Sequence, residues 1–131
     1  MNIGELARRA GCTVESLRHY EREGLLPPPA RRDNGYRDYR SEHLQRLVFV
    51  RRCRDLDMSL KDIARLLDLA DATRAPCAEV NSLVDEQIVR VQTRLAELGQ
   101  LLGQLEALRS HCSGESKTCG ILEELVQGVG E

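Results

Sequence analysis

This chain of 131 residues has no long apolar run. Its longest apolar stretches span only a few residues, such as Leu47 to Val50, whereas crossing a bilayer takes about 20 apolar residues. The first turns carry Glu5, Arg8 and Arg9, so the N-terminus lacks the charged-then-apolar layout of a secretion signal. We therefore expect a cytoplasmic protein that makes no membrane contact.

Motifs for catalysis are also missing. The sequence contains no Cys-x-x-Cys and no recognisable pair of nucleophile and base, and its acidic residues fall on predicted helix surfaces. This pattern predicts that the protein is not an enzyme. Structural disulfides are not expected in a reducing cytosol, so the cysteines are core packers, reactive thiols or metal ligands. They are Cys12, Cys53, Cys77, Cys112 and Cys119.

The net charge of −2 conceals an uneven distribution. Residues 1–54 contain twelve arginines and seven acidic residues, which gives +5. Residues 55–131 contain seven basic and fourteen acidic residues, which gives −7. A basic first half indicates a polyanionic partner such as DNA, although unselected surface variation could produce the same imbalance.

The basic half begins with the pattern of a helix-turn-helix. Residues 3–9 form the first predicted helix, which ends at Gly11. Thr13 can cap a second helix, whose apolar residues recur at helical spacing until Gly24. Two short helices joined by a glycine-containing turn place the second in position to read a major groove.

A wing follows the helix pair. Three prolines at 27–29 exclude helix, and Asn34-Gly35 is a tight-turn signal between two short extended segments. Arginine cations and tyrosine hydroxyls are groups that bind phosphate oxygens. The wing offers Arg31, Arg32, Tyr36, Arg37, Tyr39 and Arg40.

Further helices complete the chain. Ser41 is expected to cap a helix to about Asp55, and Ser59 one that runs through Leu69. After a break at residues 75–76 comes the longest helix, in which apolar residues alternate at steps of four and three, as in a coiled coil. An amphipathic helix lying on its own domain is the alternative. This seam consists of Val84, Ile88, Val91, Leu95, Leu98, Leu102 and Leu105, and a short helix over 121–126 ends the pattern.

Three cysteines flank the long helix. Cys77 precedes it, Cys112 follows it, and Cys119 lies beyond a polar loop of six residues. A helix over 79–110 is roughly 48 Å long, so Cys77 and Cys112 of one chain cannot share an ion. In an antiparallel pair, Cys77 of one subunit would meet Cys112 and Cys119 of its partner, giving a homodimer two equivalent sites.

Three thiolates favour soft or borderline ions such as Cd(II), Pb(II), Hg(II) and Zn(II), and make Mg(II) unsuitable. Zn(II) usually takes a fourth ligand, and the candidates are Asn81, Glu79, His111 or water. Each of these side chains is more often a solvated or capping residue. Cys12 and Cys53 have no paired thiol nearby and are assigned to the core.

Three segments together resemble the MerR family of bacterial transcription regulators: IGELARRAGCTVESLRHYEREGLLPP, NGYRDYRSEHLQRL and DMSLKDIARLL. The resemblance covers essentially the whole chain. It implies a mainly α fold, with a winged helix-turn-helix DNA-binding domain over 1–75. A long antiparallel coiled-coil dimerisation helix over 76–111 and a C-terminal metal-binding loop with a short helix over 112–131 would follow.

The resemblance also implies how the protein acts. A homodimer would bind a pseudo-palindromic operator in a promoter with an overlong spacer. It would distort the DNA when effector binds, so that RNA polymerase transcribes heavy-metal resistance or efflux genes. His19 stands where Tyr or Phe is usual in the family. The expected DNA contacts are Thr13, Ser16, Arg18, His19, Tyr20, Tyr36, Arg37 and Tyr39.

Within that family, Cys77, Cys112 and Cys119 resemble the three-cysteine sensors of divalent ions, and the CGIL flank looks closest to the cadmium- and lead-responsive branch. A zinc or mercury sensor stays open, because His111 adjoins Cys112. An organic or oxidative effector, a thiol-dependent enzyme and a purely structural zinc clip are the remaining alternatives.

Overall fold

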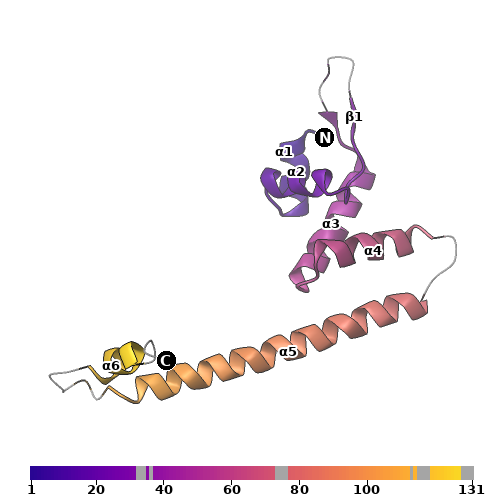
Figure 1. Cartoon of the computed structure of the whole chain (residues 1–131). Coiled ribbons are helices and arrows are strands. Elements are labelled where there is room, and N and C mark those ends of the chain that lie inside the picture. The colour runs from indigo at the N-terminus through magenta and orange to yellow at the C-terminus, as the bar shows by residue number, and fades with distance from the viewer. Residues whose placement is uncertain (32–34, 36, 73–76, 113, 115–118, 128–131) are drawn as a thin grey trace. The chain divides into compact units, whose positions relative to one another are not determined.

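The computed structural model describes residues 1–31, 35, 37–72, 77–112, 114 and 119–127. These residues fall in two compact units, Met1–Val84 and Asp85–Glu131, which are considered separately below. The elements, labelled in Figure 1, are α1 (Ile3–Ala10), α2 (Val14–Arg22), β1 (Ala30–Arg31), β2 (Arg37–Asp38), α3 (Ser41–Asp55), α4 (Leu60–Ala70), α5 (Cys77–Arg109) and α6 (Gly120–Gln127).

The predicted helix-turn-helix is confirmed in α1 and α2. The Asn2 side chain accepts a hydrogen bond from the Glu5 backbone N–H at 2.8 Å and begins α1. Gly11 ends the helix with a left-handed φ of 72°. The Thr13 hydroxyl then accepts from the Ser16 backbone N–H at 3.0 Å, as a capping residue should.

The predicted wing contains an antiparallel strand pair, in which Ala30 lies opposite Asp38. The chain terminus holds the base of the wing, because the Met1 amino group donates to the Tyr39 carbonyl at 2.8 Å. The Tyr39 backbone N–H donates to the Met1 carbonyl at the same distance of 2.8 Å. Arg32, Asn34 and Tyr36 of the predicted wing lie outside the described residues.

Helices α3 and α4 follow the predicted spans with one difference. Ser41 is the first helical residue of α3 and not its cap, so that prediction was wrong by one position. Arg40 occupies the N-cap, and its backbone N–H donates to Nδ1 of the buried His43 at 3.0 Å. Ser59 caps α4 as expected, by accepting from the Asp62 backbone N–H at 3.1 Å.

Two apolar clusters form the core of the first unit. One joins the helix-turn-helix to the wing and α3, through Leu6, Leu17, Leu26, Tyr39 and Leu47. The other joins α3 and α4 to the first turns of α5, where Leu83 is fully buried. Burying one such leucine side chain contributes about 2 kcal/mol relative to exposing it. The first turns of α5 are therefore part of the first unit.

The long helix α5 begins two residues earlier than expected, so Cys77 is its first residue. Among the described residues, the apolar seam of α5 beyond Val84 is left exposed to solvent. Each seam residue is exposed by more than a third of its surface: Val84, Ile88, Val91, Leu95, Leu98, Leu102 and Leu105. Among the described residues, none of the helices combines the length and apolarity that a membrane span requires.

Candidate DNA-binding surface and candidate metal site

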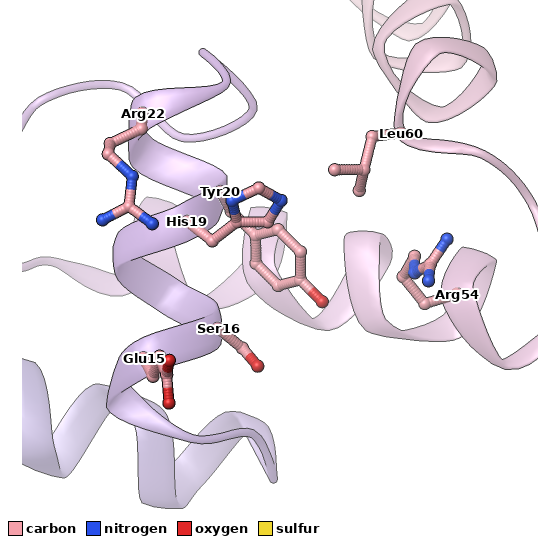
Figure 2. A pocket seen from close by; sticks show the side chains of 7 residues that line it. All are labelled: Glu15, Ser16, His19, Tyr20, Arg22, Arg54 and Leu60. Carbon is pink, nitrogen blue, oxygen red and sulfur yellow. The ribbon is translucent and has the colours of Figure 1, made fainter.

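The predicted reading helix α2 borders a surface hollow of about 390 Å³. In Figure 2, His19 and Tyr20 project from α2 toward Arg54 and Leu60. Three predicted DNA contacts thus share this hollow, while Thr13 serves as the α2 cap. Its lining consists of Glu15, Ser16, His19, Tyr20, Arg22, Arg54 and Leu60.

A second hollow of about 390 Å³ lies on the opposite flank of α2, toward the wing. Arg18, a predicted DNA contact, lines it together with Arg22 and Arg37, and Glu21 stands among these cations. Guanidinium groups clustered in this way suit the phosphate backbone of a duplex.

A polar network connects the end of α2 to the wing. Arg37 Nη1 donates to Glu21 Oε2 at 2.8 Å and to the Tyr39 hydroxyl oxygen at 3.3 Å. The Tyr39 hydroxyl donates to Glu21 Oε1. Hydrogen bonding with Tyr39 and the charge of Glu21 raise the pKa of Arg37, so its guanidinium stays cationic.

Tyr39 differs from the other predicted contacts that the structure describes, because its residue surface is only 1% exposed. Burial raises the pKa of its phenol, as does the hydrogen bond with Glu21. Tyr39 is thus part of the core in the single chain, with its hydroxyl engaged by α2. Its contact with DNA, like those of the other predicted residues, stays a prediction.

Sequence reasoning did not single out Glu21, Arg22 or Arg54. Arg22 borders hollows on both flanks of α2, and Arg54 reaches the first hollow from α3. Arg22 could have been identified from the sequence, because it is a basic residue in the last turn of the predicted recognition helix. The partners of Glu21 are 16 and 18 residues away, and no periodic pattern links such positions.

In the second unit, the structure brings together two of the three predicted metal ligands. The Cys119 side chain lies near enough to that of Cys112 to affect its ionisation, and Cys119 immediately precedes α6. The backbone N–H groups of Leu122 and Ile121 lower the pKa of the Cys119 thiol, and the contact with Cys112 lowers it further. A lowered pKa raises the thiolate fraction of Cys119, and the thiolate is the form that binds metal.

The two thiols are brought together by a close backbone approach. A β-carbon on Gly120 would collide with the His111 carbonyl oxygen and lie only 3.2 Å from the His111 β-carbon. Arg109 Nη1 also donates to the Cys112 carbonyl at 2.8 Å. The start of α6 can therefore pack on the chain beside Cys112 because residue 120 has no side chain.

The third predicted ligand, Cys77, is exposed at the start of α5 in the first unit. Of the fourth-ligand candidates, Asn81 lines an apolar cavity of about 650 Å³ beside Cys77, while Glu79 and His111 are exposed. Within the described ranges, a single chain holds no group of three potential ligands. A pair of neighbouring thiols, one with a lowered pKa, fits a soft cation and not Mg(II).

The other two cysteines pack against the core, as expected. Cys53 is 7% exposed and Cys12 is half-buried. Burial raises the pKa of both thiols, and the neighbouring charge of Arg51 only partly offsets this for Cys12. Neither environment favours the thiolate that a metal needs.

A helix-turn-helix, an arginine-bearing wing and hollows lined by guanidinium groups define a DNA-binding protein of the winged-helix class. The chain belongs to the MerR family. The family model described as MerR HTH family regulatory protein matches residues 1–70, and the one described as MerR, DNA binding matches residues 44–108.

Relatives agree with this assignment. A transcriptional regulator of Haemophilus influenzae named as a ZntR homolog is 48% identical over 109 residues, which is 83% of this chain and 81% of the relative. The solved structure of the transcription regulator PbrR691 from Ralstonia metallidurans CH34, in complex with lead(II), is 48% identical with a TM-score of 0.81. The match covers 95% of this chain and 98% of the PbrR691 chain.

A third relative carries a different ion. The solved structure of the regulator MerR from Bacillus megaterium MB1, in complex with mercury(II), is 31% identical to this chain, with a TM-score of 0.69. The match covers 96% of this chain and 99% of the MerR chain. Family members bind promoter DNA, dimerise and contact RNA polymerase. The chain is a metal-responsive transcriptional regulator of this kind and not an enzyme.

Proposed function

We propose that the protein senses Cd(II) or Pb(II) and activates heavy-metal resistance or efflux genes. Each ion would bind Cys77 of one subunit together with Cys112 and Cys119 of its partner. The observation that carries this proposal is that the Cys119 side chain lies near that of Cys112, with the pKa of Cys119 lowered by the start of α6. Two prearranged thiols form most of a three-thiolate site.

The proposal takes the third ligand from a second subunit. The exposed seam of α5 supports this step, because seven apolar residues at alternating steps of four and three are typical of helix pairing. If two α5 helices form an antiparallel coiled coil, the start of one lies beside the end of the other. Cys77 of one chain then lies beside the cysteine pair of its partner.

The choice of ion rests on the ligand set and on similarity. Thiolates prefer soft cations, and Pb(II) is the ion named for the 48% identical PbrR691 structure. Zn(II) would need a fourth ligand, for which Asn81, Glu79, His111 or water are the candidates. Hg(II) is named for a relative of lower identity.

The signal would reach DNA through the dimer geometry. The first turns of α5 belong to the DNA-binding unit, where Leu83 is buried against α3 and α4. An ion that favours one arrangement of the two α5 helices would thereby change the angle between the two DNA-binding units. Such a change distorts the operator and makes use of DNA deformability.

Mixed dimers test the shared site. A Cys77→Ser chain and a Cys112→Ser chain each form homodimers without a complete site. Their heterodimer regains one complete site, built from Cys77 of the second chain and Cys112 and Cys119 of the first. We expect one tightly bound Pb(II) or Cd(II) per heterodimer, measured by competition titration of the purified dimer. A Cys12→Ser protein, which should bind two ions per dimer, is the control.

The titration also ranks the ions. Cd(II) or Pb(II) should bind more tightly than Zn(II) and should produce distortion of the cognate promoter. Heterodimers that bind no ion would contradict the shared site. A Cys112→Ser homodimer that still activated transcription fully with Cd(II) or Pb(II) would refute the metal switch.

A further inference from the structure

We propose that Glu21 is a positioning residue for DNA binding, which holds the wing in register with the recognition helix α2. It acts through Arg37 and Tyr39 and not by touching DNA. The inference rests on the DNA binding of the family and is independent of the metal site proposed above.

The geometry uses both oxygens of the Glu21 carboxylate. Oε2 accepts from Arg37 Nη1 at 2.8 Å, and Oε1 accepts from the Tyr39 hydroxyl. Arg37 Nη1 and the Tyr39 hydroxyl oxygen are 3.3 Å apart, so the three side chains form a closed triangle. Charge-assisted hydrogen bonds of this kind are directional and strong.

The two partners belong to different parts of the wing. Arg37 is in β2, and its side chain is 43% exposed, whereas that of Glu21 is 14% exposed. The carboxylate is thus largely covered while the guanidinium faces outward. Tyr39 is buried in the core and paired with Met1 at the base of the wing. Glu21 therefore connects α2 both to the exposed guanidinium of Arg37 and to Tyr39 at the base of the wing.

The charge of Glu21 is the reverse of what a phosphate-binding surface needs. It stands in one hollow with Arg18, Arg22 and Arg37, and in another of about 440 Å³ with Arg22, Arg31 and Arg37. A carboxylate in these hollows repels phosphate. Electrostatics alone therefore predicts that neutralising Glu21 strengthens DNA binding, whereas a positioning role predicts that it weakens binding.

Because the two explanations predict opposite changes in DNA affinity, one substitution can distinguish them. The full-length Glu21→Gln protein is compared with the parent by fluorescence anisotropy, without metal, on a duplex that the parent selects from a random-sequence pool. We expect the Kd to rise about tenfold, since a charged hydrogen-bond network is broken in each subunit. The slope of log K against log salt should shrink by about two per dimer, because each wing loses one phosphate contact.

Glu23→Gln is the matched control, because it removes the same charge from an exposed residue at the end of α2. Its Kd should stay equal or fall slightly. If Glu21→Gln binds DNA as tightly as the parent or more tightly, the inference is overturned.

A second variant covers the case in which Glu21→Gln fails to fold. Tyr39→Phe keeps the buried ring and removes only the hydroxyl that donates to Glu21. It should weaken DNA binding several-fold, and its loss should be less than additive with that of Glu21→Gln when both are folded. An unchanged Kd for Tyr39→Phe, or strict additivity in the double variant, contradicts the positioning role.

Discussion

Gly120 lies against the backbone of His111 so closely that a β-carbon at position 120 would collide with the His111 carbonyl oxygen. This approach sets the start of α6 beside Cys112 and brings the Cys119 side chain near that of Cys112. The geometry of the candidate metal site therefore depends on a residue that has no side chain.

Gly120→Ala should weaken metal binding while leaving metal-free DNA binding intact. The added methyl group forces the start of α6 away from His111 and separates the two thiols. Changes that disturb the support of a metal ligand typically lower metal affinity by about 10- to 100-fold, and we expect a loss in this range for Pb(II) or Cd(II). Gly103→Ala is the control, because nothing lies within 4 Å of a β-carbon there. Equal affinities of both variants would contradict the close packing seen at residue 120.

Alkylation by iodoacetamide should distinguish Cys119 from Cys53 by its pH dependence. The thiolate is the reactive form, and the N–H groups at the start of α6 lower the pKa of Cys119, whereas burial raises that of Cys53. As pH falls, the alkylation rate of Cys119 should begin to decline at a lower pH than that of Cys53, because the thiolate fraction follows the pKa of each thiol. Peptide mass spectrometry at a series of pH values measures both rates in one metal-free sample. Coincident profiles would count against the proposed thiolate at Cys119.

Gly11→Ala should destabilise the helix-turn-helix more than Gly24→Ala does. Both glycines have left-handed φ angles, of 72° and 78°, which cost an alanine about 1–2 kcal/mol. At Gly11 the β-carbon would also lie 2.6 Å from Arg51 Nη1, which donates to the Ala10 carbonyl at 3.3 Å, whereas nothing lies near Gly24. Losing that bond should add about 1 kcal/mol to the effect of Gly11→Ala. Urea unfolding of both variants measures the difference, and equal stabilities would show that Arg51 adjusts without cost.

Leu98→Arg should dissociate the dimer, whereas Val89→Arg should not. Leu98 lies on the α5 seam and Val89 beside it, and their exposed fractions in the single chain are similar, 54% and 58%. An arginine buried in an apolar seam loses hydration without gaining a partner, so the dimer Kd should rise about 100-fold or more. Light scattering after size-exclusion chromatography reports the mass of each variant. Dissociation of both variants, or of neither, would argue against this seam as the interface.

Local signals in the sequence were enough to predict the helices. Thr13 and Ser59 cap α2 and α4 through bonds to N–H groups three residues ahead, and Gly11 ends α1 in a conformation that glycine adopts readily. These interactions form within one turn, so they can be recognised from residue type and spacing. The prediction that Ser41 caps α3 was wrong, because the N-cap is Arg40 and the side chain of His43, in the first turn of the helix, accepts a hydrogen bond from the Arg40 backbone N–H.

The sequence by itself determined the order of helices, the wing, the heptad seam and the three cysteines that flank α5. Only the tertiary structure decided that Tyr39 is a buried partner of Glu21 and that Gly120 packs on His111 beside the cysteine pair. The physical reason is separation along the chain. A cap joins residues three apart, but the bond from Tyr39 to Glu21 spans 18 positions and forms only after α2, the wing and α3 have packed into one core.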